Sequence, residues 1–525
     1  MEVTKSRKRA ERAARKAGEG FTVAQTNDGY AVQAPDGPKE SPAKEFDEYE
    51  KLVPFHGKIL QIGFGSVGQA MLPLLLRHID IDPKDITVLE MDDKTEMFER
   101  ELGHTGVKYV VQQIVKDNLD EVLSKHIDEG GFIVDLAVNI DTTEIVRWCQ
   151  EHGVMYINTS IEVWEDKPDE KIPQLWKRTL WESHDRLRKA VGKKDGPTCV
   201  LTHGANPGLV SHFVKAALLD IAKAMDLDVQ TPATREEWAA LMEKTGTKVV
   251  QISERDTQII DRPKQVGEFV CTWSPEGLWA EGRAPSEMGW GSHEDSAPLG
   301  GSVQPKDPRA AFLHQPGMSV LAKGWCPLGG YYAGFVIQHS EAITISQYFA
   351  TRDDNGDVRH SVTSYYAYAP PDAAIASIHE CRGKQALELQ DARRVMKDEI
   401  ISGIDELGVL LLGHGMNGWW FGSQLGIDEA RRLIPGENAT SLQVVSSMLG
   451  AIVFAIRNPN EGYCEPEDLP HDEVLKVARP YLGPIASVQT SWKPSDDISV
   501  LYKKPAVDRG NEWGFETFRI TPPVV

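Results

Sequence analysis

The residues of this sequence best suited to chemistry are acids and aromatic groups set within apolar, strand-like stretches. They are Glu162 in YINTSIEVW, Glu254 in QISERDTQ, Trp273 in CTWS, Glu281 in LWAEGRA and His339 in IQHSEA. A buried carboxylate is costly unless it is paired or meets a cation. Three carboxylates, an indole face and a histidine are together what a doubly charged amine requires, because carboxylates neutralise ammonium groups and an indole face attracts cations.

Taken one at a time, these residues also have ordinary structural interpretations. A strand glutamate is more often part of a solvated face, or the partner of a nearby arginine such as Arg255 or Arg283. A single tryptophan is usually part of a core, and a single histidine usually has a structural role. Because spacing cannot show whether the five side chains converge, both interpretations stay open at this level.

A glycine-rich turn in residues 58–71, KILQIGFGSVGQAM, indicates a second kind of chemistry. A short apolar run precedes glycines 63, 65 and 68, which have the G-x-G-x-x-G spacing, and helical periodicity follows them. In a dinucleotide-binding turn the first glycine permits the tight bend, the second admits the pyrophosphate and the third lets helix and strand pack closely. The free amides of the helix start then face the phosphates. The loop residues predicted to contact the cofactor are Gly63, Gly65, Ser66, Val67 and Gly68.

An acid at the end of the next apolar run, residues 86–89, supports this interpretation. Glu90 lies 27 positions after Gly63, where the motif places an acid for the adenosine ribose, and Asp92 is the alternative. Either acid could instead be an ordinary loop carboxylate. No arginine directly follows, so the sequence favours NAD over NADP as the cofactor.

Composition limits the remaining possibilities. The 525 residues suffice for two or three domains, and 41% hydrophobic with 26% charged residues is typical of a soluble globular protein. A formal charge of −21 argues against a nucleic-acid partner and suits a cationic ligand. No apolar run predicts a membrane span. The six cysteines form no C-x-x-C pair, so the sequence predicts neither disulfides nor a metal site, as expected of a cytoplasmic protein.

Residues 57–204 alternate between strand and helix patterns and so predict the element that positions the cofactor. Strands are expected at 107–113, 131–138, 154–162 and 198–204, with helices at 118–126, 141–152 and 174–190. This alternation predicts an α/β fold with a Rossmann-type, doubly wound parallel sheet. Ligands bind beyond the carboxyl ends of such strands. The residues expected there, near the nicotinamide end, are Val138, Asn139, Thr159, Ser160 and Glu162.

The rest of the chain predicts a second, α+β substrate domain with a mixed or antiparallel sheet. Residues 206–208, Asn-Pro-Gly, are expected to open a helix with Pro207 in its first turn. Strands are expected at 247–258, 267–274, 277–284, 329–349 and 360–370, and the Gly/Pro-rich residues 284–330 as long loops. Residues 440–457 predict an apolar helix that packs on the first domain or forms a subunit contact. The predicted divisions are a flexible extension at 1–55, a cofactor domain at 56–206 completed by helices from 430–480, a substrate and dimerisation domain at 207–425, and a tail at 481–525.

Six motifs in consistent order give the sequence a resemblance to a known family. IGFGSVGQAMLPLLLRH, YINTSIEVW, THGANPGLVSHFVK, ISERDTQ, TWSPEG with AEG, and MGWGSHE together resemble the bacterial homospermidine synthases, relatives of the saccharopine dehydrogenase group. The resemblance extends from about residue 57 to residue 457. It implies an NAD-dependent aminobutyl transfer in which putrescine is oxidised to an imine, ammonia leaves, a second putrescine condenses and the bound NADH reduces the product. Spermidine and 1,3-diaminopropane are further candidate substrates, and a cytoplasmic homodimer is expected.

The resemblance also implies roles for individual residues. Trp273 would stack on the cationic intermediate, Glu281 would bind an amine end, and Glu254 and Glu162 would bind ammonium groups and move protons, while Asn206 and His339 line the pocket. Asn206 and Pro207 are also expected near the cofactor. Two alternatives remain: a reductive condensation like that of saccharopine or carboxynorspermidine dehydrogenases, which would favour pocket arginines, and a non-catalytic NAD-binding protein, which would lack the acids.

Overall fold

The computed structural model describes residues 22–26, 29–33, 46–164, 174–192, 195–385, 388–495 and 511–520. Residues 1–50 and residues 51–525 form separate compact units. In the first unit, β1 (Thr22–Thr26) and β2 (Gly29–Gln33) pair antiparallel, and η1 (Phe46–Glu48) is a 3-10 turn. This hairpin lies within the predicted flexible extension, where the sequence did not predict a strand. The basic stretch at 5–16 lies outside the described residues.

A seven-stranded, wholly parallel sheet forms the first layer of the second unit. Its order is β26-β10-β9-β8-β4-β6-β7. The strands are β4 (Ile59–Ile62), β6 (Ile86–Glu90), β7 (Lys108–Val111), β8 (Phe132–Asp135), β9 (Met155–Asn158), β10 (Gly196–Val200) and β26 (Glu461–Cys464). Every residue of β4, β6, β8 and β9 is buried, because helices cover both faces of such a sheet. The predicted doubly wound parallel sheet is confirmed; β26 was not predicted.

Helices connect these strands, and all but α3, which was not predicted, lie largely where the sequence predicts. They are α2 (Ser66–His78), α3 (Thr95–Leu102), α4 (Leu119–His126), α5 (Thr142–His152) and α6 (Leu180–Val191). The Asp141 carboxylate accepts hydrogen bonds from the amides of Thr143 and Glu144 and so caps α5. Gly153, with φ of 68°, ends it. Of the predicted helix at 174–190, the first part is instead the 3-10 turn η6 (Leu175–Arg178).

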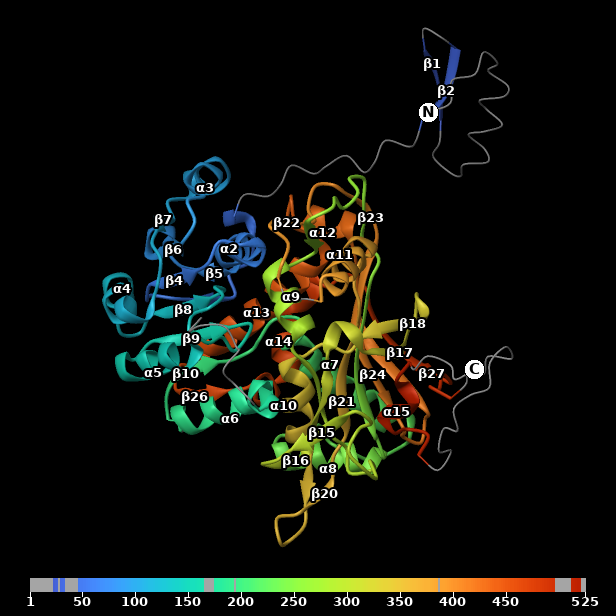
Figure 1. Cartoon of the computed structure of the whole chain (residues 1–525). Coiled ribbons are helices and arrows are strands. Elements are labelled where there is room, and N and C mark those ends of the chain that lie inside the picture. Colours follow the sequence, from blue (N-terminus) through green and yellow to red (C-terminus); the bar gives the residue numbers. More distant parts are fainter. Residues whose placement is uncertain are drawn as a thin grey trace. The chain divides into compact units, whose positions relative to one another are not determined.

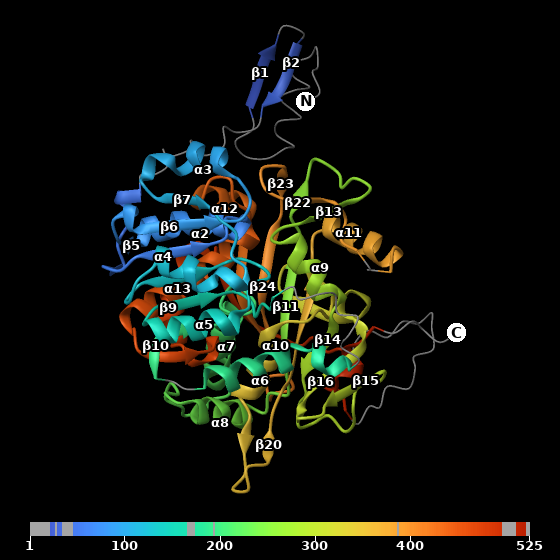
Figure 2. The same ribbon diagram turned by 60° about the vertical axis from the view of Figure 1, so that its left-hand side comes forward.

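One helix from the far end of the chain packs on this first sheet, and a second packs on that helix. α13 (Ala439–Arg457) contacts α2, β9 and β10, and α14 (His471–Ala478) packs on α13 and α7. Both views show α13, drawn in orange-red, beside the blue and cyan strands of the first sheet (Figures 1 and 2). Among the described residues α13 is the one helix apolar enough to cross a membrane, but 83% of its apolar window is buried inside the protein. The prediction that this helix packs on the first domain is therefore confirmed.

A ten-stranded mixed sheet forms the second layer. Eight strands follow the order β15-β16-β14-β21-β11-β24-β25-β27, while β18 pairs with β21 and with β17; only β11 and β21 are parallel. The strands are β11 (Val249–Asp256), β14 (Pro285–Gly289), β15 (Gly301–Gln304), β16 (Asp307–Pro316), β17 (Leu321–Cys326), β18 (Gly330–Phe335), β21 (Thr363–Ala369), β24 (Ile404–Leu412), β25 (Gly418–Gly426) and β27 (Ile485–Thr490). α7 (Leu209–Ala224) packs on β24 and β25, and α10 (Ser340–Tyr348) on β21 and β14. The predicted mixed sheet is confirmed.

Smaller elements complete the second layer. β13 (Glu268–Cys271) pairs in parallel with β22 (Ala392–Val395). The remaining elements that surround the two sheets are β3 (Val53–Pro54), β5 (Ile79–Asp80), α8 (Arg235–Thr245), β12 (Ile259–Ile260), α9 (Pro275–Arg283), β19 (Thr351–Arg352), β20 (Val358–His360), α11 (Asp372–Gly383), β23 (Ile400–Ser402), α12 (Ile427–Leu433) and α15 (Phe515–Phe518).

Four predictions for this part of the chain are wrong. Residues 277–284 belong to the helix α9, whose start is capped by the Ser274 hydroxyl, with Pro275 in the first turn. Residues 329–349 divide into the strand β18 and the helix α10. Residues 284–330, expected as loops, carry β14, β15, β16 and β17. Pro207 precedes α7 rather than lying in its first turn; its peptide bond with Asn206 is cis, and Gly208, with φ of 122°, stands at the helix start.

Asn438 fixes the start of α13 and ties it to the second layer. Its side-chain oxygen accepts from the Ser441 amide at 2.8 Å, and its nitrogen donates to the carbonyls of Thr272 at 2.6 Å and Met396 at 2.7 Å. We expect Asn438→Ala to lower the free energy of unfolding by about 2 kcal/mol or more, because a helix cap is lost and buried carbonyls lose their partner. Denaturant titration measures this. The matched change Asp82→Ala, at the exposed cap of the 3-10 turn η2 (Pro83–Asp85), should cost less than about 1 kcal/mol.

Candidate active site

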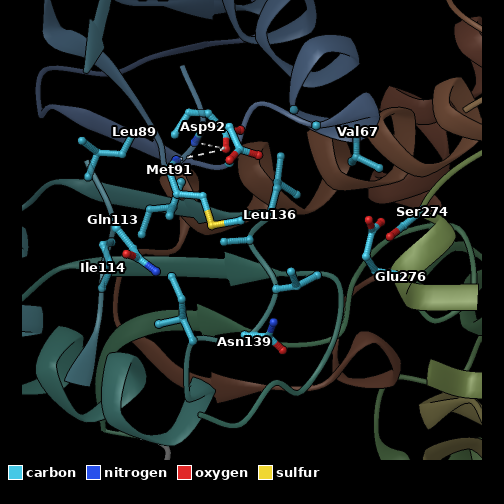
Figure 3. A pocket seen from close by; sticks show the side chains of 18 of the residues that line it. Val67, Leu89, Met91, Asp92, Gln113, Ile114, Leu136, Asn139, Ser274 and Glu276 are labelled. Atoms are coloured by element: carbon cyan, nitrogen blue, oxygen red, sulfur yellow. Dashed lines mark hydrogen bonds between the residues drawn. The ribbon is translucent and has the colours of Figure 1, made fainter. Parts of the chain in front are cut away.

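A cavity of about 730 Å³ lies at the carboxyl ends of β4, β6 and β8. The glycine-rich turn forms one wall, and the segment that leads into α9 forms another. Figure 3 shows Ser274 and Glu276 facing the cavity from one side, with Met91, Gln113 and Leu136 on the other. Its volume falls in the range of ordinary ligand pockets. The two layers of the protein thus meet around one ligand-sized space.

The glycine-rich turn has the geometry that a pyrophosphate needs. Gly63 has φ of 97°, and a Cβ on Gly68 would lie 2.4 Å from the Gly63 carbonyl oxygen. A Cβ on Gly65, in contrast, would meet nothing within 4 Å, so this glycine borders open space. No side chain caps the start of α2, which leaves its first amides available to a phosphate. The residues present therefore fit a dinucleotide.

Hydrogen bonds join the glycine-rich stretch to the second layer, and in one of them Lys397 donates to the Gln69 side chain at 2.9 Å. The Ser66 hydroxyl donates to the backbone oxygen of Trp273 at 2.8 Å. The Trp273 ring packs over Gly277 in the first turn of α9, where an added Cβ would lie 2.5 Å from the ring. Trp273 consequently lines the cavity beside the glycine turn. It is not packed in a remote core.

The two acids proposed for the ribose have different surroundings. Glu90 is buried, and its carboxylate accepts from the Phe64 amide at 2.6 Å and from Lys94 at 3.0 Å. Burial alone would raise the pKa of Glu90, but these donors lower it. Asp92 is exposed and lines the same cavity. Glu90 therefore shapes the turn, and Asp92 has the freer carboxylate for a ligand.

The predicted cofactor residues divide into two groups. Nine of them line the cavity: Gly63, Gly65, Ser66, Val67, Gly68, Glu90, Asp92, Val138 and Asn139. The other four, Thr159, Ser160, Asn206 and Pro207, are not part of its lining. Instead, Ser160 donates to Glu162 at 2.7 Å and Asn206 donates to Glu254 at 2.9 Å. These two polar side chains thus serve the acids rather than the cavity wall.

Glu254 lies on β11 and is held by two donors. The Tyr366 hydroxyl donates to its carboxylate at 2.6 Å, and the Asn206 side chain donates to the same oxygen. Only 2% of Glu254 is exposed, and burial raises its pKa to about 7. Arg255, the next residue on the strand, points to the opposite face. The solvated-face and Arg255-pair interpretations of Glu254 are therefore wrong.

His339 lies between two carboxylates at the start of α10. Its Nε2 is 3.0 Å from Glu281 at the end of α9, and its Nδ1 is 3.2 Å from the fully buried Glu341. Burial by itself would lower the pKa of His339, but the charges of Glu281 and Glu341 raise it well above its usual value. Since carboxylates only accept, both ring nitrogens donate and the imidazole is charged.

Glu162 connects this acidic group to the cavity. Its carboxylate accepts from the amide of Asn139, a cavity residue, at 3.1 Å. Burial raises the pKa of Glu281, and the charge of Glu162 contributes to that rise. The Tyr366 ring, which holds Glu254, lies 4.3 Å from the His339 ring. The predicted acids and His339 therefore gather beside the cavity, with more carboxylates than cations among them.

Several residues of the site were not predicted. Glu341 and Tyr366 hold His339 and Glu254, and Trp164, Glu276 and Arg393 line the cavity. Glu276 and Arg393 form an ion pair at 2.8 Å. The pattern QHSEA, with an acid two residues after His339, was the one local signal for Glu341. Within the described ranges, no group of three or more His, Cys, Asp or Glu side chains is placed to hold a metal ion.

Family models match both layers of the chain. A saccharopine dehydrogenase NADP-binding domain matches residues 59–200, and a saccharopine dehydrogenase C-terminal domain matches residues 204–490. Together with the fold and the glycine-rich turn, these matches define a protein of the saccharopine dehydrogenase class.

Three relatives narrow this class. Homospermidine synthase of Mesorhizobium japonicum is 38% identical over 479 residues, which is 88% of this chain and 96% of that protein. Homospermidine synthase of Blastochloris viridis is 39% identical over 471 residues, 87% and 96% of the two chains. The crystal structure of the Legionella pneumophila homospermidine synthase in complex with NAD superimposes with a TM-score of 0.82 at 36% identity, over 89% of this chain and 98% of that one. The chain belongs to the homospermidine synthase family, and the resemblance predicted from its motifs is confirmed.

Two glycines of the turn allow cofactor binding to be separated from folding. We expect Gly65→Ala to leave the Tm unchanged but to weaken NAD binding at least about tenfold, because the new methyl group occupies the phosphate space. Gly68→Ala should lower the Tm, since its Cβ would collide with the Gly63 carbonyl. Calorimetric titration with NAD and thermal unfolding measure the two effects. Unchanged NAD affinity in Gly65→Ala would contradict the assignment of the turn.

Glu254 should make stability depend on pH in a defined direction. Its folded pKa of about 7 exceeds the usual glutamate pKa of 4.5, so its contribution to stability is lost as pH rises through this window. We expect Glu254→Gln to gain Tm relative to the wild type between about pH 5 and about pH 8. Glu268, whose pKa is lowered to about 2 mainly by its hydrogen bond from Arg394, is the opposite case. Glu268→Gln should lose Tm equally at both pH values.

Proposed function

We propose that this protein joins two putrescine molecules into homospermidine with release of ammonia, using NAD without net consumption. The observation that carries the proposal is the cluster of acidic side chains beside the cavity that the glycine-rich turn borders. The identity of the relatives and the NAD complex of the Legionella pneumophila homospermidine synthase support it. Spermidine and 1,3-diaminopropane are further diamine or polyamine substrates to be tested.

NAD fits the cavity through the glycine turn, the uncapped start of α2 and the exposed carboxylate of Asp92. When bound, it accepts a hydride from the carbon next to one amine and returns a hydride to the condensed imine. The wall formed by Trp273 and the start of α9 would help to keep water from the imine, which water would hydrolyse.

Each of the acids would have a different role toward the two cationic substrates. Glu281, part-exposed and oriented by His339, would bind a distant ammonium group, and Glu162 would attract the second diamine near Asn139. The Trp273 face would hold the cationic carbon chain between them. An amine must be neutral before its carbon loses hydride or before it attacks an imine. Glu254, with a pKa of about 7, would take that proton and return it.

The alternative of a reductive condensation with an oxo acid has less support. Such a substrate carries a carboxylate, which arginines bind best. Arg393, which lines the cavity, is already paired with Glu276. The proposal also includes a cofactor domain at 56–206, a substrate domain at 207–425, a homodimer and a cytoplasmic location.

The decisive experiment incubates the purified protein with putrescine and NAD alone. Homospermidine and ammonia should form in equal amounts, with no lasting NADH absorbance, because the hydride removed from the first diamine returns to the product. Steady accumulation of NADH would indicate a plain amine dehydrogenase and would overturn the proposal.

Substitutions at Trp273 test whether its ring binds the cationic substrate. We expect Trp273→Ala to bind NAD normally but to lose about tenfold or more in kcat/KM for putrescine, since the cation loses its aromatic face. The bond from Ser66 is to the Trp273 backbone and survives the change. Trp273→Phe should retain part of the activity. Wild-type rates in Trp273→Ala would remove Trp273 from the site.

A further inference from the structure

Two buried aspartates that face each other across neighbouring strands lie next to Glu254. Asp256 on β11 pairs in register with Asp405 on the antiparallel strand β24. Glu254 lies two residues before Asp256 and therefore on the same face of the sheet. Exposure is 3% for Asp256 and 0% for Asp405. Neither aspartate is among the residues assigned above to the substrate or to the cofactor.

The hydroxyl of Thr440, in the first turn of α13, lies between the two carboxyl groups. Its oxygen is 3.1 Å from an Asp256 oxygen and 2.7 Å from an Asp405 oxygen. The side-chain amide of Gln258 donates to the same hydroxyl oxygen at 3.1 Å. A hydroxyl has one hydrogen and two lone pairs. It can therefore donate to one aspartate only, and the other aspartate must donate to it, which requires a protonated carboxyl group.

The other contacts decide which aspartate carries the proton. Asp256 accepts from the backbone amide of Gln258 at 2.9 Å, from the side chain of Gln258, and from the hydroxyl of Thr272 at 3.1 Å. These donors stabilise a carboxylate. Asp405 has no such donors: its second oxygen is buried without a hydrogen-bond partner among the described residues. The ionised form is therefore far better supported at Asp256.

We propose that Asp405 is a neutral carboxylic acid that donates its proton to Thr440, so that Asp256 is the only charged member of the pair, and that this buried charge keeps Glu254 able to carry a proton. Asp256 and Asp405 are positioning residues, because they act through Glu254 and contact neither cavity nor cofactor turn. The inference rests on the proposed function, in which Glu254 accepts a proton from a substrate ammonium and returns it.

The pKa directions agree with this geometry. Burial raises the pKa of Glu254, and the charge of Asp256 raises it further. Burial raises the pKa of Asp405 well above its usual value, with contributions from the charges of Glu254 and Asp256. Other titratable groups around the three acids are His339 and Tyr366 beside Glu254, the buried Tyr368 hydroxyl, Cys271 on β13, and Glu406 next to Asp405.

The protonation of Asp405 can be measured without any assay of activity. An infrared difference spectrum between wild type and Asp405→Asn, taken at neutral pH, should show loss of the carbonyl band of a protonated carboxyl group. Asp256→Asn should instead show loss of carboxylate bands. Loss of a carboxylate band in Asp405→Asn would overturn the inference, and this outcome does not depend on which reaction the enzyme performs.

The pH profile tests the effect on Glu254. The acid limb of kcat for homospermidine formation should move down by about one pH unit in Asp256→Asn, because Glu254 loses a neighbouring negative charge. In Asp405→Asn the acid limb should stay in place, because a neutral donor replaces a neutral donor. Glu294→Gln is the control: Glu294 is also a buried acid with pKa about 7, but its partners are Thr363 and Phe515.

The possible outcomes separate the two proposals. If the wild type forms homospermidine but Asp256→Asn leaves the acid limb in place, the inference fails and the proposed function stands. If the wild type forms no homospermidine, the proposed function fails, while the infrared spectra still decide the state of Asp405. Should Asp256→Asn not fold, Asp405→Asn and its infrared spectrum carry the test, and an acid limb that shifts in Asp405→Asn overturns the inference.

Discussion

The site depends on keeping several carboxyl groups close together and away from water without letting their repulsion open the fold. Each of these acids has a different set of hydrogen-bond and charge partners. His339 is charged between Glu281 and Glu341, Glu254 is held by two neutral donors, and Glu90 is tied to Lys94 and the Phe64 amide. Buried charges survive only when hydrogen bonds and partners compensate them. The surplus of acid that remains beside the cavity is what a substrate with two ammonium groups would neutralise.

The two sheets supply complementary halves of this arrangement. The parallel sheet ends in amides and small residues, which suit phosphates and sugar hydroxyls. The mixed sheet, the helices α9 and α10 and the residues just before these helices supply Glu254, Glu281, the indole and the imidazole, while Glu162 follows β9 of the parallel sheet. The hydrogen bond from the Ser66 hydroxyl to the Trp273 carbonyl is one of several contacts that join these halves at the cavity. The glycine-rich turn and the indole are therefore joined by a bond that involves no cofactor.

The parts of the fold that were predictable have local causes. The glycine turn, the capped start of α5 at Asp141 and its stop at Gly153 are each specified by residues within a few positions. α9 was mistaken for a strand because the short apolar run LWA lies between glycines and suits a strand as well as a helix, while the start signal, Ser274 followed by Pro275, lies just before it. The partners of the acids could not be predicted. Tyr366 lies 112 positions from Glu254, and only the parallel pairing of β11 with β21 brings the two strands together.

The edge strand β26 has a consequence for how the protein is made. Residues 461–464 complete a sheet whose other six strands lie between residues 59 and 200, and α13 covers that sheet from residues 439–457. During synthesis the first sheet emerges from the ribosome early, with one edge unpaired and part of one apolar face bare, until more than 250 further residues have been translated. A chain that stopped before residue 439 would leave this edge open to pairing with other chains, so the nascent protein needs its own late segments, or a chaperone, to stay free of aggregates.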